Sequence, residues 1–245
     1  MPLLSRKCLA AGLLGLIFLT GIPAARAQRV ARRRHHDHNG RPYYLGPLRV
    51  SAGAGTVFYN GDLGYAVSDD FLGPALNLGV LYGLGPHWRV GAELGYFAMG
   101  ARDQLPNRGL AFYSHNGLGT AFIRYDLLGD PSAYATFPGP ARRMQPFVQA
   151  GLGLVLYDPR VYQGTQPPNN STAYLPTERN DYPALAGVLP VGGGFVVPLT
   201  DRFNLTLEGL YHFTTTDYLD DISRRGNPGL KDGFTTLLLK LDCTL

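Results

Sequence analysis

Three features of the sequence predict an all-β fold, an eight-stranded antiparallel up-and-down transmembrane β-barrel of the outer-membrane type. The first is an N-terminal export signal. The second is a repeated alternation of apolar and polar residues, along segments long enough to cross a bilayer as tilted strands. The third is a rhythm of long and short connections between those segments. No later apolar run is long enough for a spanning helix, so a membrane-embedded mature chain must form a closed barrel.

The first 27 residues have the pattern of a signal peptide. Arg6 and Lys7 are basic, residues 8–22 are apolar or small, and Ala-Arg-Ala at 25–27 supplies a cleavage site before Gln28. We therefore expect export through the Sec pathway and removal of residues 1–27. The apolar run is short for a transmembrane helix.

Charge and cysteine content exclude several classes of function. From Pro42 onward the chain has 14 basic and 17 acidic residues, so its high overall pI comes from the N-terminal region. The mildly acidic body argues against a nucleic-acid partner. After removal of the signal peptide Cys243 is the only cysteine, so neither an intramolecular disulfide nor a cysteine-based zinc site is expected.

Residues 28–44 form a polar tail that contains Arg-Arg-Arg-His-His-Asp-His at 32–38. Its low apolar content predicts a flexible periplasmic segment. The histidines His35, His36 and His38 offer a weak, unselective metal site as one interpretation. Contact with anionic lipid headgroups is the simpler one.

The clearest strand is predicted at residues 88–99. Its even positions are apolar or aromatic, whereas its odd positions from Arg89 to Gly95 are charged or glycine. Side chains alternate between the two faces of a strand, so one face is apolar and the other polar. Trp88 and Tyr96 stand where the aromatic belts at the two membrane interfaces would lie.

The same alternation recurs along residues 45–245, the predicted barrel. The expected strands are 49–59, 75–83, 88–99, 110–127, 146–157, 185–197, 203–213 and 234–243. The first, third, fifth and seventh connections are long and polar, the second and sixth are tight turns, and the fourth is intermediate. Long loops at one end and short turns at the other are typical of outer-membrane barrels.

If the apolar face of each strand meets lipid, the residues that face the lumen include most of the charged residues of the strands. These residues are Arg49, Asn77, Arg89, Glu93, Arg124, Asp126, Gln149, Glu208, His212 and Lys240. A lumen this narrow is filled by side chains, and inward glycines leave room for the long ones. We expect a polar lumen network formed by Arg89, Glu93, Arg124, Glu208, His212 and Lys240. The alternative is a path for protons or small ions.

Signals for catalysis or cofactor binding are weak. Ser114 and His115, with Glu208 or Asp126, supply the residue types of a hydrolase triad, but no nucleophile-elbow motif surrounds Ser114. Asp217, Asp220 and Asp221 lack the calcium-loop pattern. The prediction is a non-enzymatic protein with no cofactor, no catalytic residues and no metal site.

Three stretches resemble one known family. They are Tyr-Asn-Gly-Asp-Leu at 59–63, Pro-Phe-Val-Gln-Ala-Gly-Leu-Gly at 146–153, and Thr-Asp-Tyr-Leu-Asp-Asp-Ile-Ser at 216–223. In this order they are similar to the small outer-membrane β-barrels of Bacteroidota, a family that includes the PorG-type component of the type IX secretion system. The resemblance implies a non-enzymatic barrel that seats a periplasmic ring of secretion proteins on the outer membrane. Asp217, Tyr218, Leu219, Asp220 and Asp221 then form a candidate partner loop.

The sequence thus predicts a structural or assembly component of the outer membrane, with membrane lipid and periplasmic secretion-ring proteins as partners. The main alternative is a general small barrel of the OmpA or OmpW kind, for envelope integrity or small-solute passage. A lipid-modifying outer-membrane enzyme and a soluble lipocalin-like barrel are further alternatives. The apolar exterior argues against the soluble form.

Overall fold

The computed structural model describes residues 33–61, 63, 69–103, 109–130, 133–134, 144–222 and 231–245. The chain divides into two compact units, Met1–Arg33 and Arg34–Leu245. The predicted signal peptide lies outside the described residues. Within the described part of the chain, no helix is long and apolar enough to cross a membrane.

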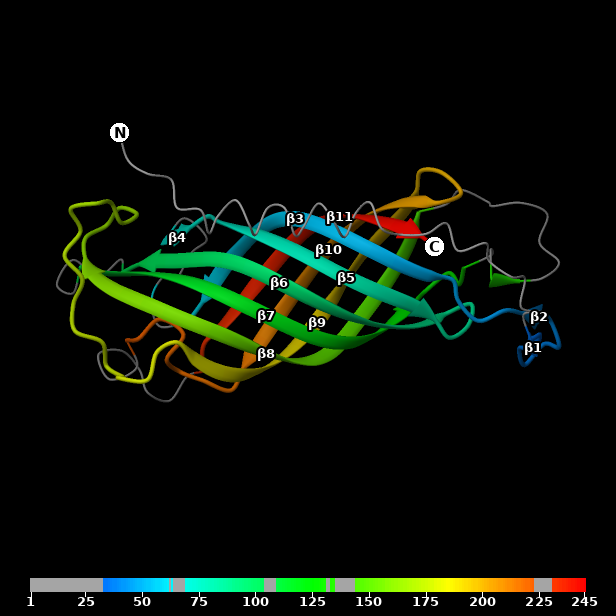
Figure 1. Ribbon diagram of the computed structural model, residues 1–245, viewed down its shortest axis with the longest axis horizontal. Coiled ribbons are helices and arrows are strands. Elements are labelled where there is room, and N and C mark those ends of the chain that lie inside the picture. Colours follow the sequence, from blue (N-terminus) through cyan, green and yellow to red (C-terminus); the bar gives the residue numbers. More distant parts are fainter. Residues whose placement is uncertain are drawn as a thin grey trace, which may run out of the picture. The chain divides into compact units, whose positions relative to one another are not determined.

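Eight long strands of the second unit form one closed antiparallel barrel, in which the strands are visibly tilted (Figure 1). Strands that follow one another along the chain pair with each other, and the last pairs with the first through β11 and β3. This confirms the predicted eight-stranded up-and-down barrel. The strands are β3 (Leu48–Asn60), β5 (Gly73–Gly83), β6 (Trp88–Arg102), β7 (Leu110–Asp126), β8 (Gln145–Gln163), β9 (Ala184–Pro198), β10 (Phe203–Thr214) and β11 (Gly233–Thr244).

Two strands extend further than their patterns predict. The expected ends at 99 and 157 lie at Arg102 in β6 and Gln163 in β8. The extension of β8 includes Pro159, although proline cannot donate to a strand ladder. Beyond Tyr157 the paired register of β8 continues only with β7, so β8 is an edge strand there and accommodates Pro159.

The two tight turns and the four long loops lie where they were predicted, but the fourth connection, which was expected to be intermediate, spans residues 127–144 and is as long as the loops. Residues 84–87 and 199–202 are short turns, whereas 61–72, 103–109, 164–183 and 215–232 are long. The long connections share one end of the barrel, which is the extracellular end if the short turns and both ends of the strand series face the periplasm. A short strand β4 (Asp70–Phe71) pairs with β6 at that outer end.

Part of the tail that was expected to be flexible has a defined pairing. β1 (His35–His36) and β2 (Pro42–Tyr43) form a two-stranded hairpin. The hairpin lies against the connection between β7 and β8, where the Tyr44 backbone N–H donates to the Ala133 carbonyl over 3.0 Å. Tyr43 also pairs with Tyr134.

Candidate functional site in the barrel lumen

Strand alternation places the predicted inward residues inside the barrel. All ten of them are buried, whereas the alternate residues of the same strands include large exposed apolar side chains. In β6, for example, Glu93 is buried and its neighbour Leu94 is 73% exposed. The candidate site is therefore the set of charges inside the barrel.

Lys240 is the centre of the lumen network. This residue of β11 is 1% exposed, and its Nζ donates to Glu93 Oε1 over 2.7 Å and to Glu208 Oε1 over 2.5 Å. Glu93 also accepts a hydrogen bond from Asn77 Nδ2 over 3.0 Å, and Glu208 accepts one from an Arg124 terminal nitrogen over 2.9 Å. Two acids and two bases balance in charge, which is the condition for stable burial of ions.

Arg124 extends this network to β8. Its Nε donates to Gln149 Oε1 over 3.0 Å, and its guanidinium carbon lies 3.8 Å from the centroid of the Phe147 ring. The planar guanidinium can bond in its plane and stack on an aromatic face at the same time. The network thus joins residues of six strands across the lumen.

Arg89 belongs to a second group at the periplasmic end. Its Nε donates to Asp126 over 2.5 Å and a terminal nitrogen donates to Asp130 over 2.6 Å. Asp130 also pairs with Arg49 over 3.0 Å. Sequence patterning had grouped Arg89 with Glu93, but no direct bond between these two is among the contacts of the described residues. Asp130 was missed because it lies in a connection, where strand alternation gives no signal.

Inward glycines make room for the long charged side chains. A Cβ on Gly53 would lie 2.6 Å from Lys240 Cγ, and a Cβ on Gly79 would lie 2.6 Å from Glu93 Cγ. Real Cβ atoms do not approach other atoms so closely, so each glycine is required by the side chain that crosses it.

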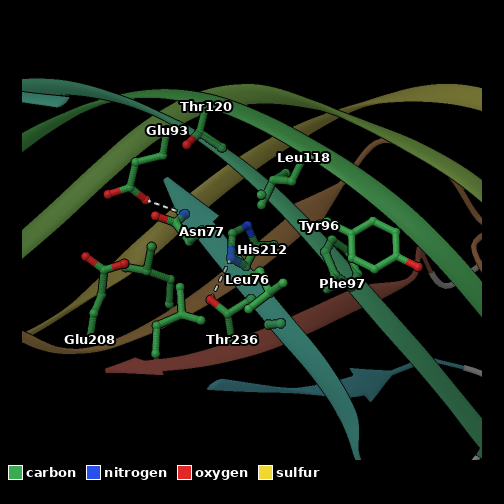
Figure 2. Close-up of a pocket in the computed structure, with 14 residues that line it drawn as sticks. Leu76, Asn77, Glu93, Tyr96, Phe97, Leu118, Thr120, Glu208, His212 and Thr236 are labelled. Atoms are coloured by element: carbon green, nitrogen blue, oxygen red, sulfur yellow. Dashed lines mark hydrogen bonds between the residues drawn. The ribbon is translucent and has the colours of Figure 1, made fainter. Parts of the chain in front are cut away.

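His212 lies apart from the ion pairs. Its ring stacks on Phe234 with centroids 4.3 Å apart, and its Nε2 is 3.0 Å from Thr236 Oγ1 (Figure 2). The residue is 2% exposed. Among the contacts of the described residues, Thr236 is its hydrogen-bond partner.

The extracellular half of the lumen is an apolar core. Side chains that were not singled out from sequence fill it, including Phe97, Met99, Phe112, Phe234 and Leu238. Each of these is at most 5% exposed. Their inward positions follow from strand alternation, but an apolar residue on both faces of a strand conceals which face is the lumen.

The candidate partner loop folds into the extracellular mouth of this core. Leu219 and Ile222 are fully buried in it, and Asp220 and Asp221 are also buried. Of the five residues in the predicted partner loop, only Asp217 and Tyr218 are partly exposed. Most of this loop therefore seals the barrel.

Buried hydrogen bonds hold the loop in place. The Tyr59 hydroxyl lies 2.8 Å from Asp220 Oδ2 and 2.6 Å from Asp232 Oδ1. Asp221 accepts from the Tyr182 hydroxyl over 2.7 Å and from the Glu178 backbone N–H over 3.0 Å. Burial, followed by the hydrogen bond to Asp221, raises the pKa of Tyr182. The hydroxyl therefore remains a donor at physiological pH.

The first long connection, between β3 and β5, contains a carboxyl group with a raised pKa. Desolvation, with the nearby charge of Asp69, raises the pKa of Asp70 to about 7. Asp70 belongs to β4, which is paired to the outer end of β6. The short strand that pairs with β6 therefore carries a carboxyl group that changes charge near neutral pH.

The outer surface of the barrel matches a membrane. Trp88 and Tyr125 contact each other with ring centroids 4.7 Å apart at the periplasmic end, and the Tyr96 hydroxyl lies 2.7 Å from His115 Nδ1 further out. Eight residues of tilted strand separate Trp88 from Tyr96, a height of about 20 Å. Exposed leucines fill the band between, including Leu78, Leu94, Leu152, Leu154, Leu207 and Leu239. An apolar band bounded by aromatic residues is the exterior of an outer-membrane barrel. The protein lies in the outer membrane.

The residues of other candidate chemistries do not converge. Ser114 is buried and donates to Asn116 Oδ1 over 2.8 Å, whereas His115 faces outward against Tyr96. Adjacent residues on opposite faces of a strand cannot act as a catalytic pair. Within the described ranges, no group of three or more metal-ligating side chains comes together.

Comparison with known proteins finds solved structures with a similar fold. No family model matches the sequence, and no curated protein is significantly similar to it. Neisserial surface protein A is 14% identical, covers 82% of this chain and 99% of its own, and has a TM-score of 0.48. Ail of Yersinia pestis is 12% identical over 81% of this chain and 97% of its own, with a TM-score of 0.44. OprG of Pseudomonas aeruginosa is 11% identical over 81% of this chain and 96% of its own, with a TM-score of 0.42. These solved outer-membrane proteins identify no substrate or partner for this chain.

Proposed function

We propose that this protein is a non-enzymatic, non-conducting barrel that serves as a structural or assembly component of the outer membrane. The observation that carries the proposal is the closed lumen. A neutral ion-pair network fills its middle, an apolar core fills its extracellular half, and a buried loop covers the core.

Passage of solutes would require these layers to open. The pairs of Lys240 with Glu93 and Glu208 would have to separate inside a barrel where all three side chains are buried. The apolar core above them would also have to part. Both requirements disfavour the alternative of small-solute passage, and they also disfavour a proton path through the extracellular half.

The specific form of the proposal is a PorG-like component of a type IX secretion machine, which rests on the sequence resemblance. The described part of the distinctive stretch, residues 216–222, belongs to the extracellular end, so a periplasmic ring would not contact it. Such a ring would instead meet the periplasmic turns and the β1–β2 hairpin, whose exposed residues include His36 and Arg41.

Conductance tests the closed lumen. The mature barrel is refolded into planar bilayers, and insertion is verified by the fluorescence of Trp88, the single tryptophan of the chain. We expect no step currents above the bare-bilayer leak. Reproducible single-channel steps that scale with the amount of inserted protein would overturn the non-conducting proposal.

Gene deletion tests the secretion role separately. We expect loss of cargo secretion, restored by the wild-type gene but not by a variant that lacks residues 34–44. A matched control carries Tyr218→Phe at the extracellular loop and should restore secretion. Normal secretion by the deletion strain, with increased sensitivity to detergents, would favour the general envelope barrel. Turnover of labelled lipopolysaccharide or phospholipid by the purified barrel would contradict its non-enzymatic character.

A further inference from the structure

We infer that the lumen binds one water molecule between β5 and β10, where it joins Asn77 to His212. The site is a cavity of about 20 Å³ between the ion-pair network and the apolar core (Figure 2). Its polar lining comes from Asn77, Glu93, Thr120, Glu208, His212 and Thr236. A cavity of this size accommodates about one water molecule.

Two buried atoms in this lining need a hydrogen-bond partner. Within the described part of the chain, Asn77 Oδ1 and His212 Nδ1 are both inaccessible to solvent and make no hydrogen bond. Asn77 is 7% exposed and His212 is 2% exposed. Buried polar atoms in folded proteins are almost always paired with protein or with ordered water.

The surrounding bonds fix what each atom requires. The Asn77 amide nitrogen donates to Glu93 Oε2 over 3.0 Å, and a carboxylate accepts only from donors. The side chain therefore cannot be turned around, and its Oδ1 requires a donor. His212 Nε2 is engaged with Thr236, so Nδ1 is the ring atom left to face the cavity.

Water is the ligand that meets both requirements. One of its protons is donated to Asn77 Oδ1, and it either donates to or accepts from His212 Nδ1, according to the tautomer. A metal ion is disfavoured because both carboxylates of the lining are already bonded to Lys240. An apolar ligand would leave both polar atoms unpaired.

The bound water would connect two separate hydrogen-bonded groups. On one side are His212 and Thr236, and on the other are Asn77, Glu93 and Lys240. β5 and β10 are separated by β3 and β11 around the barrel wall. The water therefore links two strands that are not joined to each other by backbone hydrogen bonds. This inference does not depend on the proposed role in secretion.

Nuclear magnetic resonance of the isotope-labelled mature barrel in micelles tests this site. We expect cross-relaxation between water and the Asn77 side-chain amide protons, with the signs of a long-lived bound molecule. Absence of that signal, with the Asn77 resonances resolved, would overturn the inference. A high-resolution crystal structure gives an independent test: a water should lie about 2.7–3.2 Å from both Asn77 Oδ1 and His212 Nδ1.

A pair of glycine variants locates the water. Gly95 lines the cavity, and an added Cβ would lie 3.9 Å from Asn77 Nδ2 with no contact shorter than 3.4 Å. We expect Gly95→Ala to displace the water and abolish the signal. Gly117→Ala, on the lipid face of the adjoining strand with its Cβ 3.9 Å from Leu156, is the matched control and should retain it. A wild-type signal in a folded Gly95→Ala barrel would place the water elsewhere and contradict the assignment.

Discussion

Replacement of Lys240 by methionine is the sharpest test of the lumen network. Methionine keeps an unbranched chain of similar length but removes the ammonium group that joins Glu93 to Glu208. The variant leaves these two carboxylates and Arg124 in the central network, a net charge of one unit inside the barrel. We expect a large loss of stability without a change of fold.

The magnitude follows from the contacts. At an effective dielectric constant near 20, Coulomb's law gives about 6 kcal/mol of attraction for the 2.7 Å pair of Lys240 and Glu93. Most of this attraction offsets the cost of removing the ions from water. Breaking a buried pair by removal of one partner typically costs about 3–5 kcal/mol. Asn77 and Arg124 still bind the remaining carboxylates, so we expect a value within that range despite the loss of two bonds.

Reversible urea unfolding in lipid vesicles, followed by Trp88 fluorescence, measures this free energy. Lys231→Met is the matched control, because Lys231 is exposed in a loop, and it should change stability by less than about 0.5 kcal/mol. The double variant Lys240→Met with Glu93→Gln restores charge balance and should recover much of the loss. A loss below about 1 kcal/mol for Lys240→Met would refute the reasoning, since surface pairs have that value. So would a double variant that is no more stable than the single one.

Three further predictions test the exterior, the loop and the titratable contact. Leu94→Arg, in the middle of the lipid-facing band, should cost about 2–4 kcal/mol in the same unfolding assay, whereas Leu245→Arg at the periplasmic end should be near neutral. Tyr59→Phe removes the hydroxyl between two loop carboxylates; it should cost about 1–3 kcal/mol and speed proteolysis of the loop, and unchanged cleavage would contradict the sealing role. Because the folded pKa of Asp70 is raised, the folded state binds more protons than the unfolded one between about pH 4 and 7, so stability falls as pH rises through that window. The protection factors of the β4 amides, which correct the exchange rates for base catalysis, should therefore fall toward pH 7, and Asp70→Asn should remove this fall.

The barrel could be predicted from sequence because its signal repeats. Alternation with period two identifies which face each strand residue occupies, and a one-residue error would reverse every assignment on that strand. For this reason Glu93, Glu208 and Lys240 could all be assigned to the interior before their contacts were known. Six of the eight strands begin and end within two residues of the prediction.

The parts that escaped prediction depend on contacts far apart in sequence. Asp130 lies in a connection, yet it forms ion pairs with both Arg49 and Arg89. Burial of Leu219 and Ile222 depends on the width of the mouth and on Tyr59, which is 160 residues away from Leu219. An Asp-Tyr-Leu-Asp-Asp sequence has the composition of an exposed loop, and only the tertiary structure shows that its acidic residues accept buried hydrogen bonds.

The distribution of charge inside the barrel bears on where function lies. In the central network, two acids and two bases cancel, so that layer presents no field that would select one ion over another. A selective pore instead places charges of one sign around an open passage. Here opposite charges are joined directly and the passage above them is apolar, which stabilises the closed form in both layers. The surfaces left for recognition are the two ends of the barrel, and the periplasmic end carries a hairpin, β1–β2, that the barrel itself does not need for closure. Removal of that hairpin should therefore affect partner binding while leaving the unfolding free energy of the barrel nearly unchanged, and a large loss of stability would instead assign the hairpin to the fold.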